Sequence, residues 1–379
     1  MNIQIDGTNT LNKGAELMFY AILGEIKKGC PNATVYFNSN APSGIKIEKD
    51  PDIDLRERLA LIYSKYPNFI LSKLGLPNTF FTSKYALKKI DLVLDGGGFQ
   101  FGDQWNYSKE KLDTWEAYFK QLKQNGSKII LLPQAFGPFE TESGKRSVEI
   151  INKYADIIIA RESVSYDYLI KAGATPSKIW QYSDFTLLAK GVLLDKYNFA
   201  KGKVCVIPNQ KMVSHTTGSS SEYMDFLIKV INEFKRLNKE VFLLNHEGPK
   251  DYNLCIQINQ AFDNKLAIVN GLNAKEIKGV IGASNIVVSS RFHGVASALN
   301  QGVPCLATSW NHKYKMLFQD FGQEDKIFDF QGPWEPNSDK IKEVIKNHES
   351  IQNTLMTKKH ELVKEANEMW NRIWEFGKK

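Results

Sequence analysis

Short apolar stretches rich in β-branched residues alternate with amphipathic helical stretches along most of this chain. Strands that are separated by helices pair in parallel, and the helices then cover both faces of the sheet. The alternation therefore predicts an α/β protein built from doubly wound parallel sheets. The expected strands cover residues 1–5, 34–37, 92–94, 128–132, 157–160, 204–207, 241–244, 286–288 and 305–308.

The length of 379 residues is too great for one comfortable core and suits two domains. A polar, basic and irregular segment lies near the midpoint between the two sets of expected strands. We therefore predict an α/β domain over 1–188, a linker over 189–203, a second α/β domain over 204–335 and C-terminal helices over 336–379. An apolar stripe in the last segment predicts packing across the domains.

The stretch 286–304 places an arginine and a histidine where a buried strand becomes a helix. Ser290 and its neighbour can cap the helix, which the spacing predicts over 295–300. The turn is expected to present free backbone N–H groups, the guanidinium of Arg291 and the imidazole of His293 to one point. This arrangement predicts an anion site that contains a proton donor. The alternative is that Arg291 only forms a salt bridge and His293 is a core histidine.

Near the N-terminus, a turn at Asn12 and Gly14 precedes a helix expected over 17–27. Glycine allows backbone to approach a ligand closely, and the carboxylate of Glu16 in the first helical turn is favoured by the helix dipole. We predict that this turn acts in catalysis or binds an acceptor substrate. Alternatively, Glu16 is only a charge that favours the start of the helix.

Three successive expected strands of the first domain end in residues suited to ligand contacts. Gly97 and Gly98 follow the first of them, Gln134 follows the second, and Arg161 follows the third. Open parallel sheets bind ligands at the carboxyl ends of their strands, so these residues are expected at one edge. The glycine turn matches neither the phosphate loop nor the dinucleotide pattern.

Two further strands, in the second half of the chain, are also followed by polar residues. His246 and Glu247 come after the strand 241–244, where they could orient a hydroxyl group or simply cap a turn. Lys313 comes shortly after the strand 305–308. A lysine is a movable point charge that suits a phosphate or carboxylate, although a solvated surface lysine is the common alternative.

The sequence does not favour a metal site. Asp50, Asp52 and Asp54 resemble a metal-binding pattern, but they are expected in a polar loop with no strand before them. The four cysteines are scattered, without the spacing of a zinc site or a disulfide framework. We predict no essential metal.

The segment 56–89 carries seven basic residues against one acidic residue, with aromatic residues interleaved. Such a surface can lie on anionic lipid, which predicts a possible peripheral membrane contact. The alternative is a helical insertion whose aromatic residues are core.

No apolar run is long enough to span a membrane, so the protein is expected in the cytoplasm. The net charge of +7 is a mild excess and no nucleic-acid motif is present, so no nucleic-acid partner is expected.

Taken together, these motifs resemble the polysaccharide pyruvyl transferase family from the first strand to about Gly322. The most specific part is the Arg291 to Gly294 element followed by Ala-Leu and Gly-Val-Pro. The resemblance implies two facing α/β domains of the glycosyltransferase type called GT-B, with an acceptor side in the first domain and a donor side in the second. It also implies phosphoenolpyruvate as a co-substrate, no other cofactor, and as acceptor a sugar of a cell-surface glycan, often lipid-linked.

The implied reaction joins the enolpyruvyl group to the sugar as a ketal and releases phosphate. His293 would be the general acid, since histidine has a pKa of ~6.5, and Glu16 would be the base. The donor would be bound by Arg161, Arg291, Lys313, Ser290 and Gly294. The acceptor would be bound by Asn12, Gly14, Gly97, Gly98, Gln134, His246 and Glu247.

Two other functions use many of the same residues. An inverting GT-B glycosyltransferase would hold a nucleotide sugar with Arg291 and Lys313. The cations, and the lack of an evident base-stacking element in the second domain, favour a small anionic donor over a nucleotide. A glycan-binding protein without catalytic activity would not need His293.

Overall fold

The computed structural model of the chain describes residues 1–37, 52–57, 89–214, 220–308 and 312–378. Its contacts divide the chain into two compact units. Unit 1 consists of Met1–Thr10, Met18–Phe185 and Ala366–Lys379, and unit 2 consists of Leu11–Leu17 and Thr186–Glu365. Helices α1 (Lys13–Gly29) and α13 (His348–Lys378) each contribute residues to both units.

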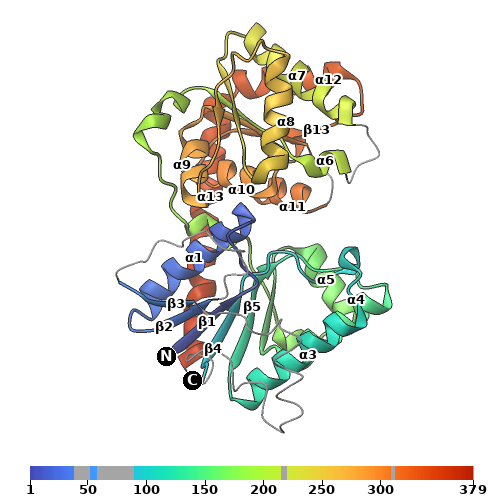
Figure 1. Cartoon of the computed structure of the whole chain (residues 1–379), viewed down its shortest axis with the longest axis vertical. Helices are drawn as coiled ribbons and strands as arrows, with labels where there is room; N and C mark the ends of the chain where they lie inside the picture. The colour runs from blue at the N-terminus through green and yellow to red at the C-terminus, as the bar shows by residue number, and fades with distance from the viewer. Residues whose placement is uncertain (38–51, 58–88, 215–219, 309–311, 379) are drawn as a thin grey trace. The chain divides into compact units, whose positions relative to one another are not determined.

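Unit 1 contains a parallel sheet with the order β3-β2-β1-β4-β5-β6-β7 (Figure 1). Its strands are β1 (Asn2–Asp6), β2 (Thr34–Phe37), β3 (Asp54–Glu57), β4 (Leu92–Asp95), β5 (Lys128–Gln134), β6 (Ile157–Ala160) and β7 (Ile179–Gln181). Besides parts of α1 and α13, its α-helices in the described residues are α3 (Lys109–Gln124), α4 (Glu142–Tyr154) and α5 (Ser163–Lys171). The buried central strands and the inward faces of α3 and α4 form its core.

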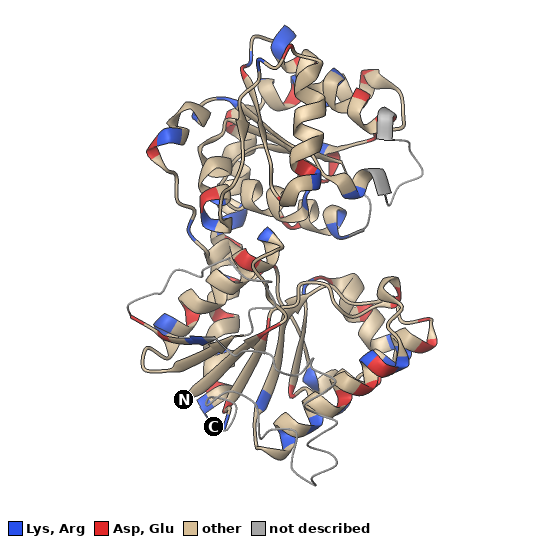
Figure 2. Cartoon of the chain, viewed as in Figure 1, with Lys and Arg blue, Asp and Glu red and all other residues tan. Residues whose placement is uncertain are grey.

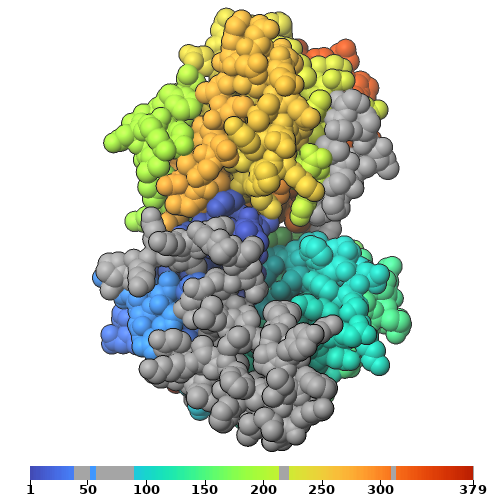
Figure 3. Space-filling model, in the orientation of Figure 1, coloured from blue at the N-terminus to red at the C-terminus, as the bar shows by residue number. Residues whose placement is uncertain are grey.

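Unit 2 contains a second parallel sheet, with the order β10-β9-β8-β11-β12-β13. Its strands are β8 (Val204–Ile207), β9 (Val241–Leu244), β10 (Ile268–Val269), β11 (Ile286–Ser289), β12 (Cys305–Thr308) and β13 (Ile327–Phe328). Its helices include α6 (Gln210–Ser214), α7 (Ser220–Arg236), α8 (Gly248–Gln260), α9 (Ala274–Ala283), α10 (Phe292–Leu299), α11 (His312–Asp320) and α12 (Trp334–Lys346). Helix α8 forms part of the outer surface of this unit (Figure 3).

Each sheet has one point where the order of strands reverses. In unit 1 the chain builds outward from β1 in one direction and from β4 in the other. In unit 2 the same change occurs between β8 and β11. Ligands of open α/β sheets bind outside the carboxyl ends of the strands at such switch points. The fold therefore predicts that the residues following β1, β4, β8 and β11 contact ligands.

The predicted fold class is confirmed, because both units are parallel α/β sheets with helices on their faces. Several predicted strands have the observed boundaries, including 157–160 and 204–207. Two helices begin earlier than predicted. Helix α1 begins at Lys13, because the side chain of Asn12 accepts a hydrogen bond from the N–H of Ala15 at 3.0 Å and so caps it. Helix α10 begins at Phe292 rather than at residue 295.

The contact division differs from the predicted domain limits of 1–188, 189–203, 204–335 and 336–379. Residues 11–17 belong with unit 2, and the boundary near the middle of the chain falls after Phe185. The last turns of α13 belong with unit 1, where Trp370 packs edge-on against Phe185 at 6.0 Å between ring centroids. Tertiary contacts of this kind, which a change in composition does not reveal, join the end of the C-terminal helix to unit 1.

The aspartates of the predicted polar loop are arranged differently from the expectation. Asp54 is the first residue of strand β3, so that prediction of a loop was wrong for this residue. Its carboxylate pairs with Arg56 on the same strand, with Nη2 and Oδ2 2.6 Å apart. Asp50 and most of the segment 56–89, including the predicted membrane surface, lie outside the described residues.

No helix in the described part of the chain combines the length and apolar character that crossing a membrane requires.

Candidate functional site

The turn between β11 and α10 is held by contacts within unit 2. The Ser289 hydroxyl accepts a hydrogen bond from the N–H of Arg291 at 3.1 Å, and the N–H of Ser290 donates to the carbonyl of Ile207 at 3.1 Å. These two N–H groups are therefore engaged, and Arg291 rather than a serine occupies the cap position. A Cβ at Gly294 would lie 2.5 Å from Ser289 Oγ, so glycine permits α10 to approach β11.

Ser290 connects the loops at the switch point of unit 2. Its hydroxyl accepts hydrogen bonds from Tyr223 and Thr308, both at 2.6 Å. Its carbonyl accepts from Asn209, which follows β8, at 2.7 Å and from Tyr314 at 2.9 Å. Ser290 is buried, and its polar atoms are engaged with the protein. The structure thus gives Ser290 a role in positioning the turn, and its predicted contact with a donor stays a prediction.

The guanidinium of Arg291 is buried between two carboxylates. Its Nη2 lies 2.6 Å from Asp251 Oδ2, and its Nη1 lies 2.7 Å from Glu247 Oε2. The salt bridge that was the alternative for Arg291 is therefore present. Residues four positions apart share one face at the start of α8, which explains why Glu247 and Asp251 reach the same arginine. Burial raises the pKa of Asp251, and the charge of Arg291 opposes this rise.

The N-terminal turn is joined to Arg291 through Glu247. Glu247 Oε2 accepts a second hydrogen bond, from Asn12 Nδ2 at 3.1 Å. In the following turn of α1, Lys13 Nζ lies 2.6 Å from Glu16 Oε2, and Glu16 is almost fully buried. Asn12, Glu16 and Glu247, which were predicted from separate motifs, therefore belong to one neighbourhood of unit 2.

His293 packs directly against the N-terminal turn. A Cβ built at Gly14 would lie 2.1 Å from His293 Nδ1, so the imidazole rests on backbone that only glycine leaves accessible. His293 is half-buried and stands in the first turn of α10. The structure thus brings together Gly14 and His293, two residues that the sequence placed in different predicted domains.

Replacing Gly14 by alanine should therefore displace the imidazole. If His293 acts on a reacting atom, a displacement of about 1 Å is expected to lower kcat roughly 10²-fold. Steady-state kinetics of Gly14→Ala would measure this loss. Gly24→Ala is a matched control on the same helix, since a Cβ at Gly24 meets nothing within 4 Å. Equal kcat for both variants and the unaltered protein would contradict the positioning role of Gly14.

His246 is the second histidine of this neighbourhood. It is 4% exposed, and its pKa lies well below the ordinary value, because burial disfavours the charged form and Arg291, His293 and Lys13 repel it. His246 is therefore neutral near neutral pH. A neutral imidazole can donate or accept a hydrogen bond without adding to the cationic charge. The predicted acceptor-binding residue His246 lies beside Arg291, a predicted donor-binding residue.

Lys313 also belongs to unit 2. Its Nζ lies 5.2 Å from the centre of the Phe292 ring, next to His293 in sequence. The Phe292 ring packs edge-on against His293 at 5.2 Å between ring centroids. Lys13, Arg291 and His293 each act electrostatically on His246, and Lys313 lies over the ring of Phe292, the residue between Arg291 and His293. This surrounding is suited to an anion that also needs a proton.

The remaining predicted site residues lie in unit 1, at the carboxyl ends of its strands. The side chain of Arg161 is buried, with Nη1 3.5 Å from Asp184 Oδ2. Its N–H donates to the carbonyl of Gln134 at 3.1 Å, and the carbonyl of Gly98 accepts from the N–H of Ala135 at 3.0 Å. The prediction that three neighbouring strands end at one edge is therefore confirmed by the order β4-β5-β6.

Sequence reasoning missed a pair of carboxylates at the switch point of unit 1. Asp6 and Asp95 end β1 and β4 and are paired across these two strands. Asp95 accepts hydrogen bonds from the N–H of Gly97 at 2.9 Å and from Gln100 Nε2 at 2.7 Å. Burial, followed by the charge of Asp6, raises the pKa of Asp95 from 3.8 to about 7. A prediction that β1 and β4 are adjacent parallel strands would have placed Asp6 beside Asp95.

The raised pKa of Asp95 predicts a pH-dependent stability. The folded protein binds a proton at Asp95 that the unfolded chain releases above about pH 4, so this stabilisation is lost as the pH rises through about 7. Asp95→Asn mimics the protonated form and should be more stable than the unaltered protein at about pH 8, by at most about 4 kcal/mol. Denaturant unfolding at several pH values measures this difference.

Below about pH 4, where Asp95 is protonated in both the folded and the unfolded state, the Asp95→Asn variant and the unaltered protein are expected to unfold with similar free energies. Asp113→Asn, at an exposed position of α3, is the control and should follow the unaltered protein at every pH. Parallel pH profiles for all three proteins would show that Asp95 does not titrate in this range.

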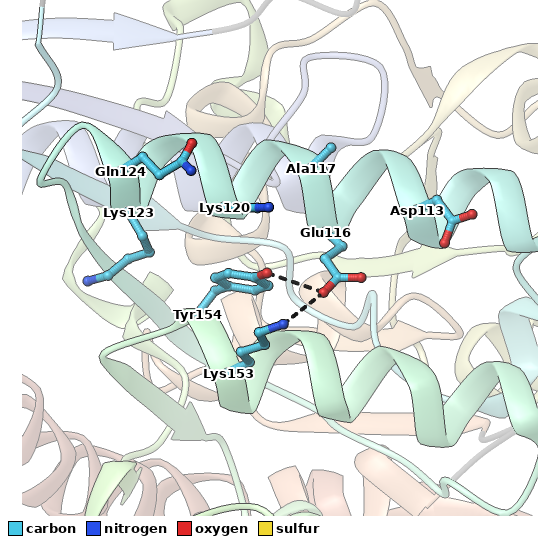
Figure 4. Close-up of a pocket in the computed structure, with 8 residues that line it drawn as sticks. All are labelled: Asp113, Glu116, Ala117, Lys120, Lys123, Gln124, Lys153 and Tyr154. Carbon is cyan, nitrogen blue, oxygen red and sulfur yellow. Dashed lines mark hydrogen bonds and ion pairs between the residues drawn. The ribbon is translucent and has the colours of Figure 1, made fainter.

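A groove between α3 and α4 lies away from these strand ends (Figure 4). It is lined by Asp113, Glu116, Ala117, Lys120, Lys123, Gln124, Lys153 and Tyr154. Lys123 Nζ is 2.7 Å from Asp156, which directly precedes β6 and so marks the amino end of that strand. Both helices carry charges of both signs (Figure 2), and Glu116 pairs with Lys153 at 3.2 Å. The groove is therefore a solvated, ion-paired surface.

Comparison with known proteins places this chain in a family. A sequence profile described as polysaccharide pyruvyl transferase matches residues 12–312. The amylovoran biosynthesis protein AmsJ of Erwinia amylovora is 22% identical over 294 residues, which cover 72% of this chain and 69% of that protein. The matched range includes every predicted site residue except Lys313, which follows its end directly.

Solved structures show the same fold at low sequence identity. The structure of Anabaena HepE in complex with UDP and glucose has a TM-score of 0.62 at 11% identity and covers 99% of this chain and 98% of that chain. A putative UDP-N-acetylglucosamine 2-epimerase from Listeria monocytogenes has a TM-score of 0.57 at 12% identity, with coverage of 93% and 90%. These structures are GT-B-like, which agrees with the two parallel-sheet units. On the family match over most of its length, this chain belongs to the polysaccharide pyruvyl transferase family.

Proposed function

We propose that this protein transfers the enolpyruvyl group of phosphoenolpyruvate to a sugar of a cell-surface polysaccharide precursor, forming a ketal and releasing phosphate. The observation that carries the proposal is the position of His293 beside Arg291 at the switch point of unit 2, with Lys13 and His246 in the same electrostatic neighbourhood. Phosphoenolpyruvate carries a phosphate and a carboxylate, and cationic side chains recognise both groups.

In the proposed reaction, His293 donates a proton to the methylene carbon of phosphoenolpyruvate, which becomes a methyl group. A sugar hydroxyl attacks the adjacent carbon, forming a C–O bond and losing its proton to a base. The bond from this carbon to the phosphate oxygen then breaks. A second hydroxyl of the same sugar attacks the same carbon and closes the ketal, and its proton leaves to the base or the phosphate. Fixed positive charge stabilises the departing phosphate.

The two carboxylates on Arg291 have different roles in this proposal. Asp251 is fully buried, whereas the side chain of Glu247 is 23% exposed. We infer that the donor replaces Glu247 on Arg291 and leaves Asp251 in place, because removing a buried carboxylate from its cation is costly. Arg161 and Lys313 remain proposed donor contacts, together with Ser290 and Gly294 through the turn that they form.

The proposed base and most of the proposed acceptor contacts come from the predicted turn residues. Glu16 is the proposed base, with Lys13 holding its carboxylate at 2.6 Å. Gly97, Gly98 and Gln134 of unit 1 are proposed to contact the sugar, with Asn12, Gly14, His246 and Glu247 of unit 2. We propose no cofactor or essential metal, and the acceptor is a free or lipid-linked sugar. Contact with an anionic membrane through 56–89 remains part of the proposal.

Mass spectrometry tests the function directly. Candidate glycans are incubated with the protein and phosphoenolpyruvate, and we expect a pyruvyl ketal on the glycan with matching release of inorganic phosphate. Thermal unfolding with phosphoenolpyruvate should show a stabilising shift. A shift with UDP-glucose alone would replace the proposal by nucleotide-sugar transfer. Glycan binding with neither donor would support a protein without catalytic activity.

A further inference from the structure

The loop between β4 and α3 is fixed to the carboxyl edge of the sheet in unit 1. The N–H of Gly137 donates to the carbonyl of Phe101 at 3.1 Å, and the N–H of Asp103 donates to the carbonyl of Pro138 at 3.0 Å. The Asp103 carboxylate also accepts a hydrogen bond from the Thr141 hydroxyl at 2.6 Å. Backbone and side-chain bonds thus hold this loop against the loop that follows β5.

The same loop presents an aromatic surface to solvent. Trp105 is 44% exposed, and its Nε1 donates to the carbonyl of Phe99 at 3.1 Å. The indole stacks on Tyr107 at 6.4 Å between ring centroids, with 21° between the planes, and Tyr107 packs edge-on against Trp115 at 4.7 Å. The indole orientation is therefore fixed by a hydrogen bond and by a neighbouring ring. A group of partly exposed aromatic rings on a fixed loop is a feature of binding surfaces.

We propose that this aromatic surface, formed by Phe99, Trp105 and Tyr107, binds a saccharide. The C–H groups on the face of a sugar ring carry a partial positive charge, which complements the negative face of an aromatic ring. Gln104 and Asn106, which flank Trp105, are exposed and uncharged. Amides donate and accept hydrogen bonds, as sugar hydroxyls require. The proposal rests on the sugar acceptor of the proposed function and names where part of that acceptor is held.

A buried amide at the same sheet edge supports a hydroxyl-bearing ligand. Gln134 is fully buried, and within the described ranges neither its Nε2 nor its Oε1 has a hydrogen-bond partner. A buried amide without a partner destabilises the fold, and hydrogen bonds to a bound hydroxyl would remove that cost. The residue after it, Ala135, donates its N–H to the carbonyl of Gly98, in the turn directly before Phe99. The backbone hydrogen bond from Ala135 thus connects the Gln134 amide, which could contact a sugar hydroxyl, to the aromatic loop.

Saccharide binding by Trp105 variants tests this proposal. Lactose, maltose and cellobiose serve as probes, with binding followed by saturation-transfer NMR and by indole fluorescence. We expect saturable binding to the unaltered protein and about tenfold weaker binding to Trp105→Ala. Trp105→Phe keeps an aromatic face and should weaken binding less. Phe199→Ala is the control, an aromatic residue of unit 2 that is 37% exposed, and should bind like the unaltered protein.

Three results would overturn the saccharide surface. They are equal binding by Trp105→Ala and the unaltered protein, no binding of any probe by the unaltered protein, and a response of Trp105 to uridine but to none of the saccharides. The proposed reaction is checked separately, by thermal unfolding with phosphoenolpyruvate. Trp105→Ala should keep the full shift with phosphoenolpyruvate. Saccharide binding through Trp105 without any such shift would leave the surface standing and reject pyruvyl transfer.

Discussion

His293→Gln is expected to lower the rate of ketal formation by about 10²- to 10⁴-fold, the usual contribution of a general acid. Glutamine keeps a polar side chain against Gly14 but cannot deliver a proton to carbon. Phosphate release with phosphoenolpyruvate and an acceptor glycan measures the rate. The thermal shift with phosphoenolpyruvate alone should persist, because the proposed donor contacts Arg161, Arg291 and Lys313 remain to bind the anion.

His360→Gln is the matched control for this substitution. His360 is exposed on α13, so its replacement should change neither the rate nor the stability. A His293→Gln protein that releases phosphate at the unaltered rate would remove His293 from the mechanism. A protein that loses the thermal shift as well would make His293 a binding residue for the donor rather than its acid.

Arg291→Ala is expected to destabilise the protein by about 3–5 kcal/mol, because it leaves a buried carboxylate without its cation. Asp251 is fully buried and is within 2.6 Å of the guanidinium, so it carries most of this cost. Glu247 can turn toward solvent and contributes less. Urea unfolding followed by tryptophan fluorescence gives the change in free energy.

A double variant separates the buried charge from other effects of Arg291→Ala. Arg291→Ala with Asp251→Asn removes both charges and should recover part of the lost stability, which a double-mutant cycle measures as coupling. Arg291→Lys keeps a charge but loses the forked geometry, so its stability should be intermediate. If Arg291→Ala unfolds like the unaltered protein, the ion pair with Asp251 is not a stabilising contact in solution.

The strands that the sequence failed to predict are β3, β7, β10 and β13, the four edge strands of the two sheets. Central parallel strands are covered on both faces and appear as continuous apolar runs, whereas edge strands are short and partly solvated. Strands β10 and β13 have only two residues each, which is too short for any periodic signal. The core of the fold is therefore predictable from hydrophobicity, but its borders depend on pairing.

The candidate site shows a similar division. The residues after strands were identifiable, because ligand-binding positions in α/β sheets follow from where strands end. The contact between Gly14 and His293 was not identifiable, since the N-terminal turn belongs with unit 2 only through tertiary contacts. Asp251 is four positions after Glu247, so the helix period could have revealed it had the start of α8 been assigned. The interaction of Asp95 with Asp6 could be predicted only if β1 and β4 were known to be neighbours.

The assignment of residues 11–17 to unit 2 has a practical consequence for protein engineering. A hybrid of two family members made by one crossover near Phe185 would pair the glycine turn of one parent with the histidine of the other. The imidazole would then rest on a foreign backbone. A hybrid that preserves this fit would carry residues 11–17 together with 186–365 from one parent and take residues 366–379 from the other. Hybrids of two relatives should therefore keep this contact when the segments are interleaved and lose it in a simple fusion of halves.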